Sequence, residues 1–70
     1  MNLDLFLIAE SAPLRDALKL IETNQHGMVL TRNASGVVTG LATDGHIRRA
    51  LLNGAALDSP IQKCANANFV

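Results

Sequence analysis

The chain has 70 residues, which is enough for a single domain. A domain of this size buries about 60% of the surface that its unfolded chain exposes, so its hydrophobic core is thin. The single cysteine, Cys64, excludes an internal disulfide, and His26, His46 and Cys64 lack the paired spacing of zinc ligands. The remaining source of extra stability is association, and a composition of 49% apolar and 17% charged residues predicts an apolar surface for it.

Charge and composition also exclude several classes of partner. The formal net charge is zero, and the chain has neither Trp nor Tyr to stack on a base, so we expect no nucleic-acid partner. No stretch approaches the roughly 20 apolar residues of a membrane span, so we expect no membrane contact. The start of the chain lacks the basic segment of a secretory signal, which together with the lone thiol favours the cytoplasm.

The first half of the chain predicts a strand followed by an amphipathic helix. Residues 3–9 are largely apolar and predict a short strand or extended arm. Pro13 suits the first turn of a helix. The apolar residues that follow recur at helical spacing on one face: Leu14, Ala17, Leu18 and Ile21. Residues 24–27, ending in Gly27, predict the helix end.

A hairpin is predicted next. Residues 28–32 and 37–42 have strand character, and the polar turn at 33–36 between them favours antiparallel pairing. Gly40 inside the second strand indicates a bulge or a close backbone approach. Thr31 and Arg32 are polar, which predicts that their strand is partly exposed or pairs across an interface.

The remaining sequence predicts a second helix and a C-terminal extension. Thr43 and Asp44 are suitable caps for a helix that ends at residues 53–54, and residues 58–60 precede another short helical turn. The predicted order is therefore β-α-β-β-α, an α/β (α+β) fold with a short antiparallel or mixed sheet and two packed helices. We expect one domain over residues 1–70, in which 58–70 form an extension or a junction to further sequence.

Three segments in this order resemble the cystathionine-β-synthase-type (CBS) domain. Residues 11–18 look like its first-helix signature, residues 33–40 like its hairpin, and residues 43–51 like its strand-to-helix motif. The likeness covers nearly the whole chain. It implies one motif of a pair, in which a second CBS motif or an identical chain is the partner.

A closer likeness lies in residues 43–54 and 57–61. They are similar to the CBS domains attached to sugar-nucleotide and sugar-phosphate nucleotidyltransferases. The resemblance implies an accessory, regulatory domain of a larger enzyme.

The CBS resemblance also implies a pocket for an adenosyl nucleotide: AMP, ADP, ATP or S-adenosylmethionine. No cofactor is required. Thr43 and neighbouring amides would meet phosphate oxygens, because a helix N-terminus favours an anion. Backbone near Ile8 and around residues 28–30 would line the base. The residues that this assigns to the nucleotide are Ile8, Met28, Val29, Leu30, Thr43, Asp44 and His46. An equally good reading is that Thr43 and Asp44 only cap the helix.

His46 departs from the family pattern, which usually has Asp at this position. A carboxylate can accept two hydrogen bonds from ribose hydroxyls, whereas neutral imidazole offers one acceptor and one donor. His46 therefore has three readings: a pH-sensitive residue, a phosphate-facing residue, or a solvent-facing residue in the first helical turn. The substitution favours an alternative function, a ligand-free dimerisation module with the same fold.

No catalytic role is predicted. Ser11 lies outside any nucleophile-elbow sequence, and Cys64 lies among small and apolar residues, as a buried inert thiol would. Arg48 and Arg49 point about 100° apart on a helix, so at most one could face a given site. We expect pairing through the helices of an isologous dimer.

Overall fold

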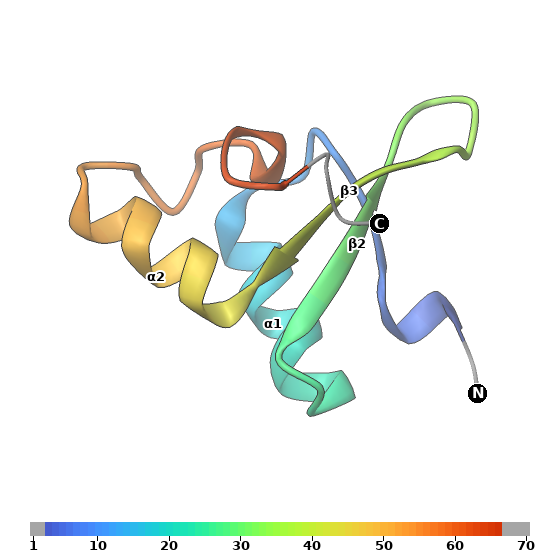
Figure 1. Ribbon diagram of the computed structural model, residues 1–70, viewed down its shortest axis with the longest axis horizontal. Coiled ribbons are helices and arrows are strands. Elements are labelled where there is room, and N and C mark those ends of the chain that lie inside the picture. The colour runs from blue at the N-terminus through green and yellow to red at the C-terminus, as the bar shows by residue number, and fades with distance from the viewer. Residues whose placement is uncertain (1–2, 67–70) are drawn as a thin grey trace.

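The computed structural model describes residues 3–66, which form a three-stranded sheet with helices on one side (Figure 1). The elements in chain order are η1 (Leu3–Leu5), β1 (Leu7–Ala9), α1 (Leu14–Asn24), β2 (Met28–Arg32), β3 (Val38–Thr43), α2 (Asp44–Leu52) and η2 (Ile61–Lys63). The β-α-β-β-α order predicted from the sequence is confirmed. Among residues 3–66, no helix is long and apolar enough to cross a membrane.

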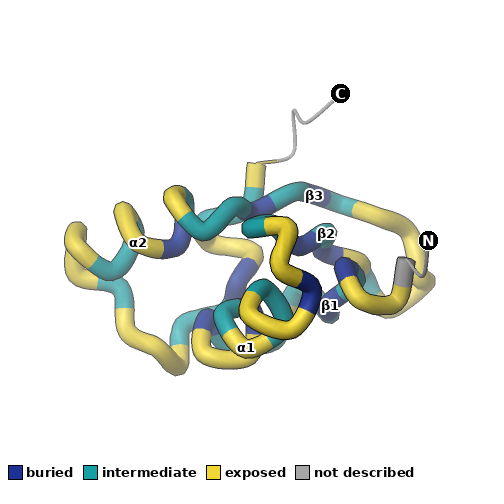
Figure 2. Tube along the Cα trace, turned by 90° about the horizontal axis from the view of Figure 1, so that it is seen from below, coloured by how far each residue is buried: buried dark blue, intermediate teal, exposed yellow. Residues whose placement is uncertain are grey.

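The sheet has the strand order β1-β2-β3. β1 runs parallel to β2, with Leu7 opposite Leu30, and β2 runs antiparallel to β3, with Val29 opposite Ala42. A parallel pair needs a crossover connection, and α1 supplies it. Figure 2 shows both helices on the same side of the three strands.

The core lies between the sheet and the helices. Burial alternates along the strands, because successive side chains point to opposite faces. All seven residues of the main apolar cluster are at most 9% exposed: Ile8, Leu14, Ala17, Val29, Ala42, Ile47 and Ile61. Every element from β1 onward therefore contributes to one small core.

The first helix begins and ends as predicted. Pro13 has the extended backbone of the residue before a helix (φ −72°, ψ 156°). Leu14 and Ala17 are fully buried, while Leu18 and Ile21 are half-buried. The helix ends where Gln25 adopts a left-handed conformation (φ 58°).

The first strand is shorter than predicted. Pairing with β2 covers Leu7–Ala9, whereas residues 3–5 form the 3-10 turn η1. Only the residues that lie beside β2 gain ladder hydrogen bonds, and the Phe6 carbonyl accepts the last one, from Leu30 N at 2.6 Å. Apolar composition alone could not reveal where that pairing stops.

The hairpin is confirmed, with a polar turn held by one side chain. Asn33 Oδ1 accepts hydrogen bonds from Ser35 N (2.9 Å) and Val37 N (3.1 Å). Gly36 has φ 84°, a conformation that favours glycine. The second strand begins one residue later than predicted, at Val38, because Val37 still belongs to this turn.

Gly40 marks both a register shift and a close approach, as its position predicted. Thr31 pairs with Gly40 but Arg32 pairs with Val38, so Thr39 is an extra residue in β3. A Cβ at Gly40 would lie 3.1 Å from both Thr31 Oγ1 and Ala65 Cβ. Glycine is needed here because Thr31 and the C-terminal segment pack directly against its backbone.

Thr31 corrects the expectation of partial exposure. Arg32 is exposed, but Thr31 is only 1% exposed. Its hydroxyl lies 3.1 Å from that of Thr39, whose hydroxyl also lies 3.3 Å from Glu10 Oε1. A buried polar side chain is tolerated when it has hydrogen-bond partners, and the strand therefore stays in the core.

After α2, the chain returns across the start of α1. We call residues 53–66 the C-terminal segment. Leu14 N donates to Ser59 O (2.9 Å) and Arg15 N donates to Leu57 O (3.0 Å), so the segment accepts two of the first-turn amides of α1. Ile61 then enters the core, fully buried, and Asn66 pairs with Leu41 at the outer edge of β3.

Candidate functional site

The junction between β3 and α2 is organised by Thr43 and His46. Thr43 has an extended backbone (φ −100°, ψ 166°), and its Oγ1 accepts a hydrogen bond from His46 N at 3.1 Å. Thr43 N in turn donates to His46 Nδ1 at 3.1 Å. The pair forms a capping box in which histidine occupies the position that Glu or Gln usually takes. The capping interpretation of Thr43 is therefore confirmed.

The capping box settles which ring nitrogen of a neutral His46 carries the proton. Nδ1 accepts from Thr43 N, so it must be unprotonated in that bond. The neutral ring then has its proton on Nε2, where it can serve only as a donor. His46 is half-buried rather than fully solvent-facing.

The other amides at the start of α2 are also largely engaged. Asp44 N donates to Gly27 O at 2.8 Å, which ties the first residue of α2 to the turn before β2. Asp44 Oδ2 pairs with Arg48 at 2.6 Å on the surface. Among the described interactions, Gly45 N is the first-turn amide that remains for a ligand, together with the Thr43 hydroxyl proton. An anion at this helix end would therefore meet fewer donors than the sequence predicts.

The structure brings four of the seven predicted site residues together. Met28 lies directly opposite Thr43 in the β2–β3 ladder. Asp44 and His46 follow Thr43 in the first turn of α2. We call Met28, Thr43, Asp44 and His46 the junction group. β2 and α2 meet at this point because β3 pairs with β2 and continues into α2 without an intervening loop.

The other three predicted residues lie elsewhere on the sheet. The side chains of Ile8 and Val29 are 9% and 0% exposed and point into the core. Leu30 is half-buried on the opposite face. Ile8 and Val29 could thus offer a ligand their backbone only, whereas Met28 and Leu30 could offer their side chains.

Among residues 3–66, no helix covers the apolar side of the sheet that faces away from α1 and α2, and we call this side the helix-free face. Leu7, Leu30 and Leu41 stand in one row across the three strands, and all three are half-buried. Met28 lies on the same face, two residues before Leu30. By contrast, exposed residues follow the outer sides of both helices (Figure 2), and those of α1 are polar: Arg15, Asp16, Lys19, Glu22 and Thr23.

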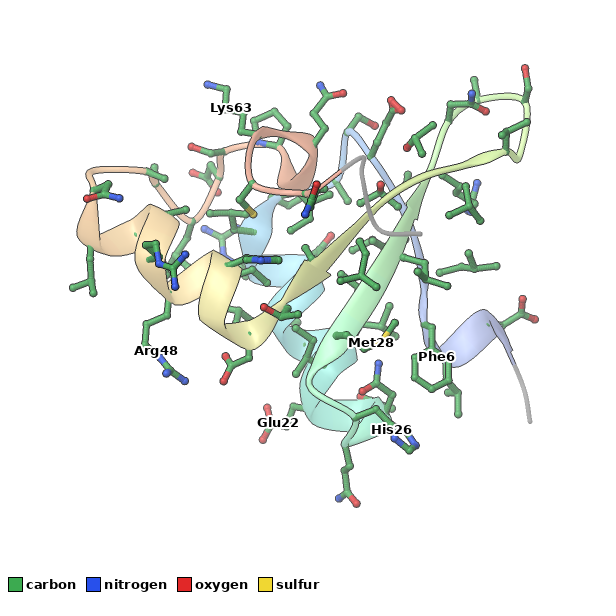
Figure 3. All side chains as sticks on the ribbon, viewed as in Figure 1. Phe6, Glu22, His26, Met28, Arg48 and Lys63 are labelled. Carbon is green, nitrogen blue, oxygen red and sulfur yellow. The ribbon has the colours of Figure 1, made fainter. Side chains whose placement is uncertain are left out.

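Asn24 is a contributor to this region that the sequence analysis did not identify. It is 6% exposed, at the last position of α1, and its amide contacts both η1 and β2. Figure 3 shows Phe6, His26 and Met28 gathered around this end of the sheet. The available signal was a polar residue that continues the buried stripe of α1 one turn beyond Ile21.

Two further features of the described residues concern metal binding and thiol reactivity. Within residues 3–66, no three His, Cys, Asp or Glu side chains lie close enough together to hold a metal ion. Cys64 is half-buried, and burial raises the pKa of its thiol, which opposes formation of a reactive thiolate.

Comparison with known proteins identifies the family and its structural relatives. The model of the CBS domain matches residues 1–53. An uncharacterized protein of Helicobacter pylori (strain J99) is 36% identical over 59 residues, which cover 84% of this chain and 18% of that protein. A second strain, 26695, has a protein with the same identity and coverage. This chain therefore spans less than a fifth of the curated relatives that it matches.

Solved structures share the fold over nearly the whole chain. A conserved protein from Pyrococcus horikoshii aligns with a TM-score of 0.83 and 25% identity, over 100% of this chain and 54% of its own. A CBS-domain-containing protein from Agrobacterium tumefaciens aligns with a TM-score of 0.84 and 21% identity, over 93% of this chain and 50% of its own. A CBS-domain protein from Pyrobaculum aerophilum was solved in complex with AMP. It aligns with a TM-score of 0.81 and 19% identity, over 93% of this chain and 55% of its own. This chain thus corresponds to about half of each of these three.

Proposed function

We propose that this chain, which belongs to the CBS domain family, is a regulatory module that senses an adenosyl nucleotide at the β3–α2 junction. The observation that carries the proposal is the convergence of Met28, Thr43, Asp44 and His46 at one point of the fold. Support also comes from the Pyrobaculum aerophilum relative, whose structure is a complex with AMP. In this function the module has no catalytic step of its own and acts in the cytoplasm.

Each junction residue has a distinct part in the proposed binding. The Thr43 hydroxyl and Gly45 N donate to phosphate oxygens, and the partial positive charge at the α2 N-terminus adds to the attraction. The Nε2 proton of neutral His46 donates to an oxygen or nitrogen of the ligand. The Met28 side chain, on the helix-free face, packs against the base.

Isothermal titration with AMP, ADP, ATP and S-adenosylmethionine tests this function. Saturable binding of one ligand, retained within about twofold in Thr43→Ser and weakened about tenfold or more in Thr43→Ala, is the expected result. Thr43→Ser is the matched control for the cap, because serine also caps helices well and retains a hydroxyl. If the unaltered chain and His46→Asp both ignore all four ligands, the nucleotide-sensing function is wrong.

A second candidate is a pairing module without a ligand. It is favoured by the capping box, which occupies Thr43 N and His46 N, two backbone amides that could otherwise donate to a nucleotide phosphate. It is also favoured by the apolar residues Leu7, Leu30 and Leu41 on the helix-free face, since apolar surface of this kind usually mediates association. We place the pairing contact on this face rather than on the helices, because the outer side of α1 is charged.

We also propose that this module is attached to a nucleotidyltransferase domain in a longer protein. The likeness of residues 43–54 to the CBS domains of sugar-nucleotide and sugar-phosphate nucleotidyltransferases supports an attached domain of that class. The curated relatives are about five times longer than their match to this chain, which leaves room for such a domain. Ligand binding by the module would then alter its packing against the attached enzyme.

A further inference from the structure

The side chain of Asn24 joins three parts of the chain through hydrogen bonds. Its Nδ2 donates to Leu5 O at 2.9 Å and to Met28 O at 3.1 Å. Its Oδ1 accepts from His26 N at 2.8 Å. One side chain, 6% exposed, therefore links η1, the turn after α1, and the first residue of β2.

These contacts fix where β2 begins. The carbonyls of Leu5 and Met28 converge on the same amide group, so the distance between the N-terminal turn and β2 depends on Asn24. The next contact between these two parts is the bond from Leu30 N to Phe6 O at 2.6 Å. Phe6 and His26 also approach each other, with ring centroids 5.2 Å apart (Figure 3).

The start of β2 in turn fixes the start of α2. Gly27 O, which lies between two residues bonded to Asn24, accepts the bond from Asp44 N at 2.8 Å. Met28, whose carbonyl Asn24 holds, lies opposite Thr43 in the ladder. A continuous series of contacts therefore leads from Asn24 through the 26–28 turn to the junction group.

We infer that Asn24 is a positioning residue for the β3–α2 junction, which acts by holding the 26–28 turn against which α2 begins. As far as it concerns a ligand, this inference rests on the proposed nucleotide function. Aspartate is the informative replacement, because it has the same shape but no donor for the two carbonyl oxygens. It retains an acceptor for His26 N, while the contacts to Leu5 O and Met28 O are replaced by repulsion between oxygen atoms.

The test compares Asn24→Asp with the milder core variant Ile61→Val, at temperatures where the two variants are equally stable. Amide hydrogen exchange is measured by NMR on the 70-residue chain for Asp44, at the junction, and for Ala42, in the middle of β3. In Asn24→Asp, exchange at Asp44 is expected to become at least tenfold faster relative to Ala42. In the Ile61 variant, both amides should become faster by the same factor, since that change lowers stability without touching the turn.

An unchanged ratio of Asp44 to Ala42 exchange in Asn24→Asp would overturn the inference. If Asn24→Asp does not fold, the same ratio is measured in Asn24→Ser, which is too short to reach both carbonyls. Titration with AMP adds a second readout: affinity should fall about tenfold in Asn24→Asp and stay within twofold in the Ile61 variant. If the unaltered chain binds no nucleotide, the proposed function fails, while the exchange ratio still decides the role of Asn24.

Discussion

Thr43 and His46 hold each other through two hydrogen bonds of 3.1 Å, one in each direction between backbone N–H and side chain. The bonds satisfy two amides at a helix start that would otherwise lack partners. They also place a histidine where the CBS resemblance suggests an aspartate. The same two residues thus serve the stability of α2 and the candidate site.

Replacing His46 should separate these two roles. His46→Ala removes the acceptor for Thr43 N and is expected to lower the free energy of unfolding by about 0.5–1.5 kcal/mol, the usual net value of such a bond. His46→Gln can restore the capping box and should remain within about 0.5 kcal/mol of the unaltered chain. Urea unfolding followed by circular dichroism measures both. No loss of stability in His46→Ala would show that the side-chain bond contributes nothing.

Ile61 should be essential although it lies beyond the residues that match the family model. It is fully buried, and Ile61 N donates to Ala12 O at 2.7 Å. Ile61→Ala is expected to cost about 2–5 kcal/mol, which approaches the whole stability of so small a domain. Removal of residues 55–70 should abolish the cooperative thermal transition. A chain of residues 1–54 that still melts cooperatively would contradict this role of the C-terminal segment.

The loss of stability caused by a substitution in α2 should depend on how deeply the residue is buried in the core. Ile47 is fully buried, whereas Leu51 is half-buried at the margin of the core. Ile47→Ala is expected to cost about 2–5 kcal/mol, and Leu51→Ala less, because less apolar surface returns to water. The measurement is the midpoint of urea unfolding. A larger loss for Leu51→Ala would mean that the helix packs through a different face.

The helix-free face of the sheet should carry self-association. Leu30→Lys places a charge in the middle of that face and is expected to convert any dimer to monomer in sedimentation equilibrium. Leu52→Lys is the matched control, because Leu52 is 81% exposed at the end of α2. The Leu52→Lys variant should therefore dimerise as the unaltered chain does. Dissociation by Leu52→Lys with retention by Leu30→Lys would instead support pairing through the helices.

Cys64 should react slowly and influence stability only in alkaline solution. Burial raises the pKa of its thiol above the ordinary value of 9.0. The folded state therefore favours the protonated form, and the stability that this contributes is present below pH 9 and declines as the pH rises through the folded-state pKa. Alkylation by iodoacetamide should reach half its maximal rate above pH 9 in the folded chain. Cys64→Ser should lose less stability than the unaltered chain between pH 9 and 10.5.

The element order and the caps could be predicted from the sequence because they depend on local chemistry. The apolar spacing in α1, the left-handed turn that ends at Gly27 and the polar turn at residues 33–36 each act within a few residues. Thr43 was predicted as a cap, and Gly40 as a bulge or close approach, for the same reason. The resemblance to CBS domains added the family and the candidate ligand, which no local pattern could supply.

Contacts between distant residues were decided only by the tertiary structure. Residue 24 meets residues 5 and 28, residue 14 meets residue 59, and residue 61 completes a core whose other members lie between residues 8 and 47. The burial of Thr31, the shortness of β1 and the division of the predicted site between the junction and the core depend on such contacts. Local sequence determines which elements form. Which polar groups find partners, and which apolar face stays open, depends on how those elements pack, because hydrogen bonding and burial are properties of the assembled chain.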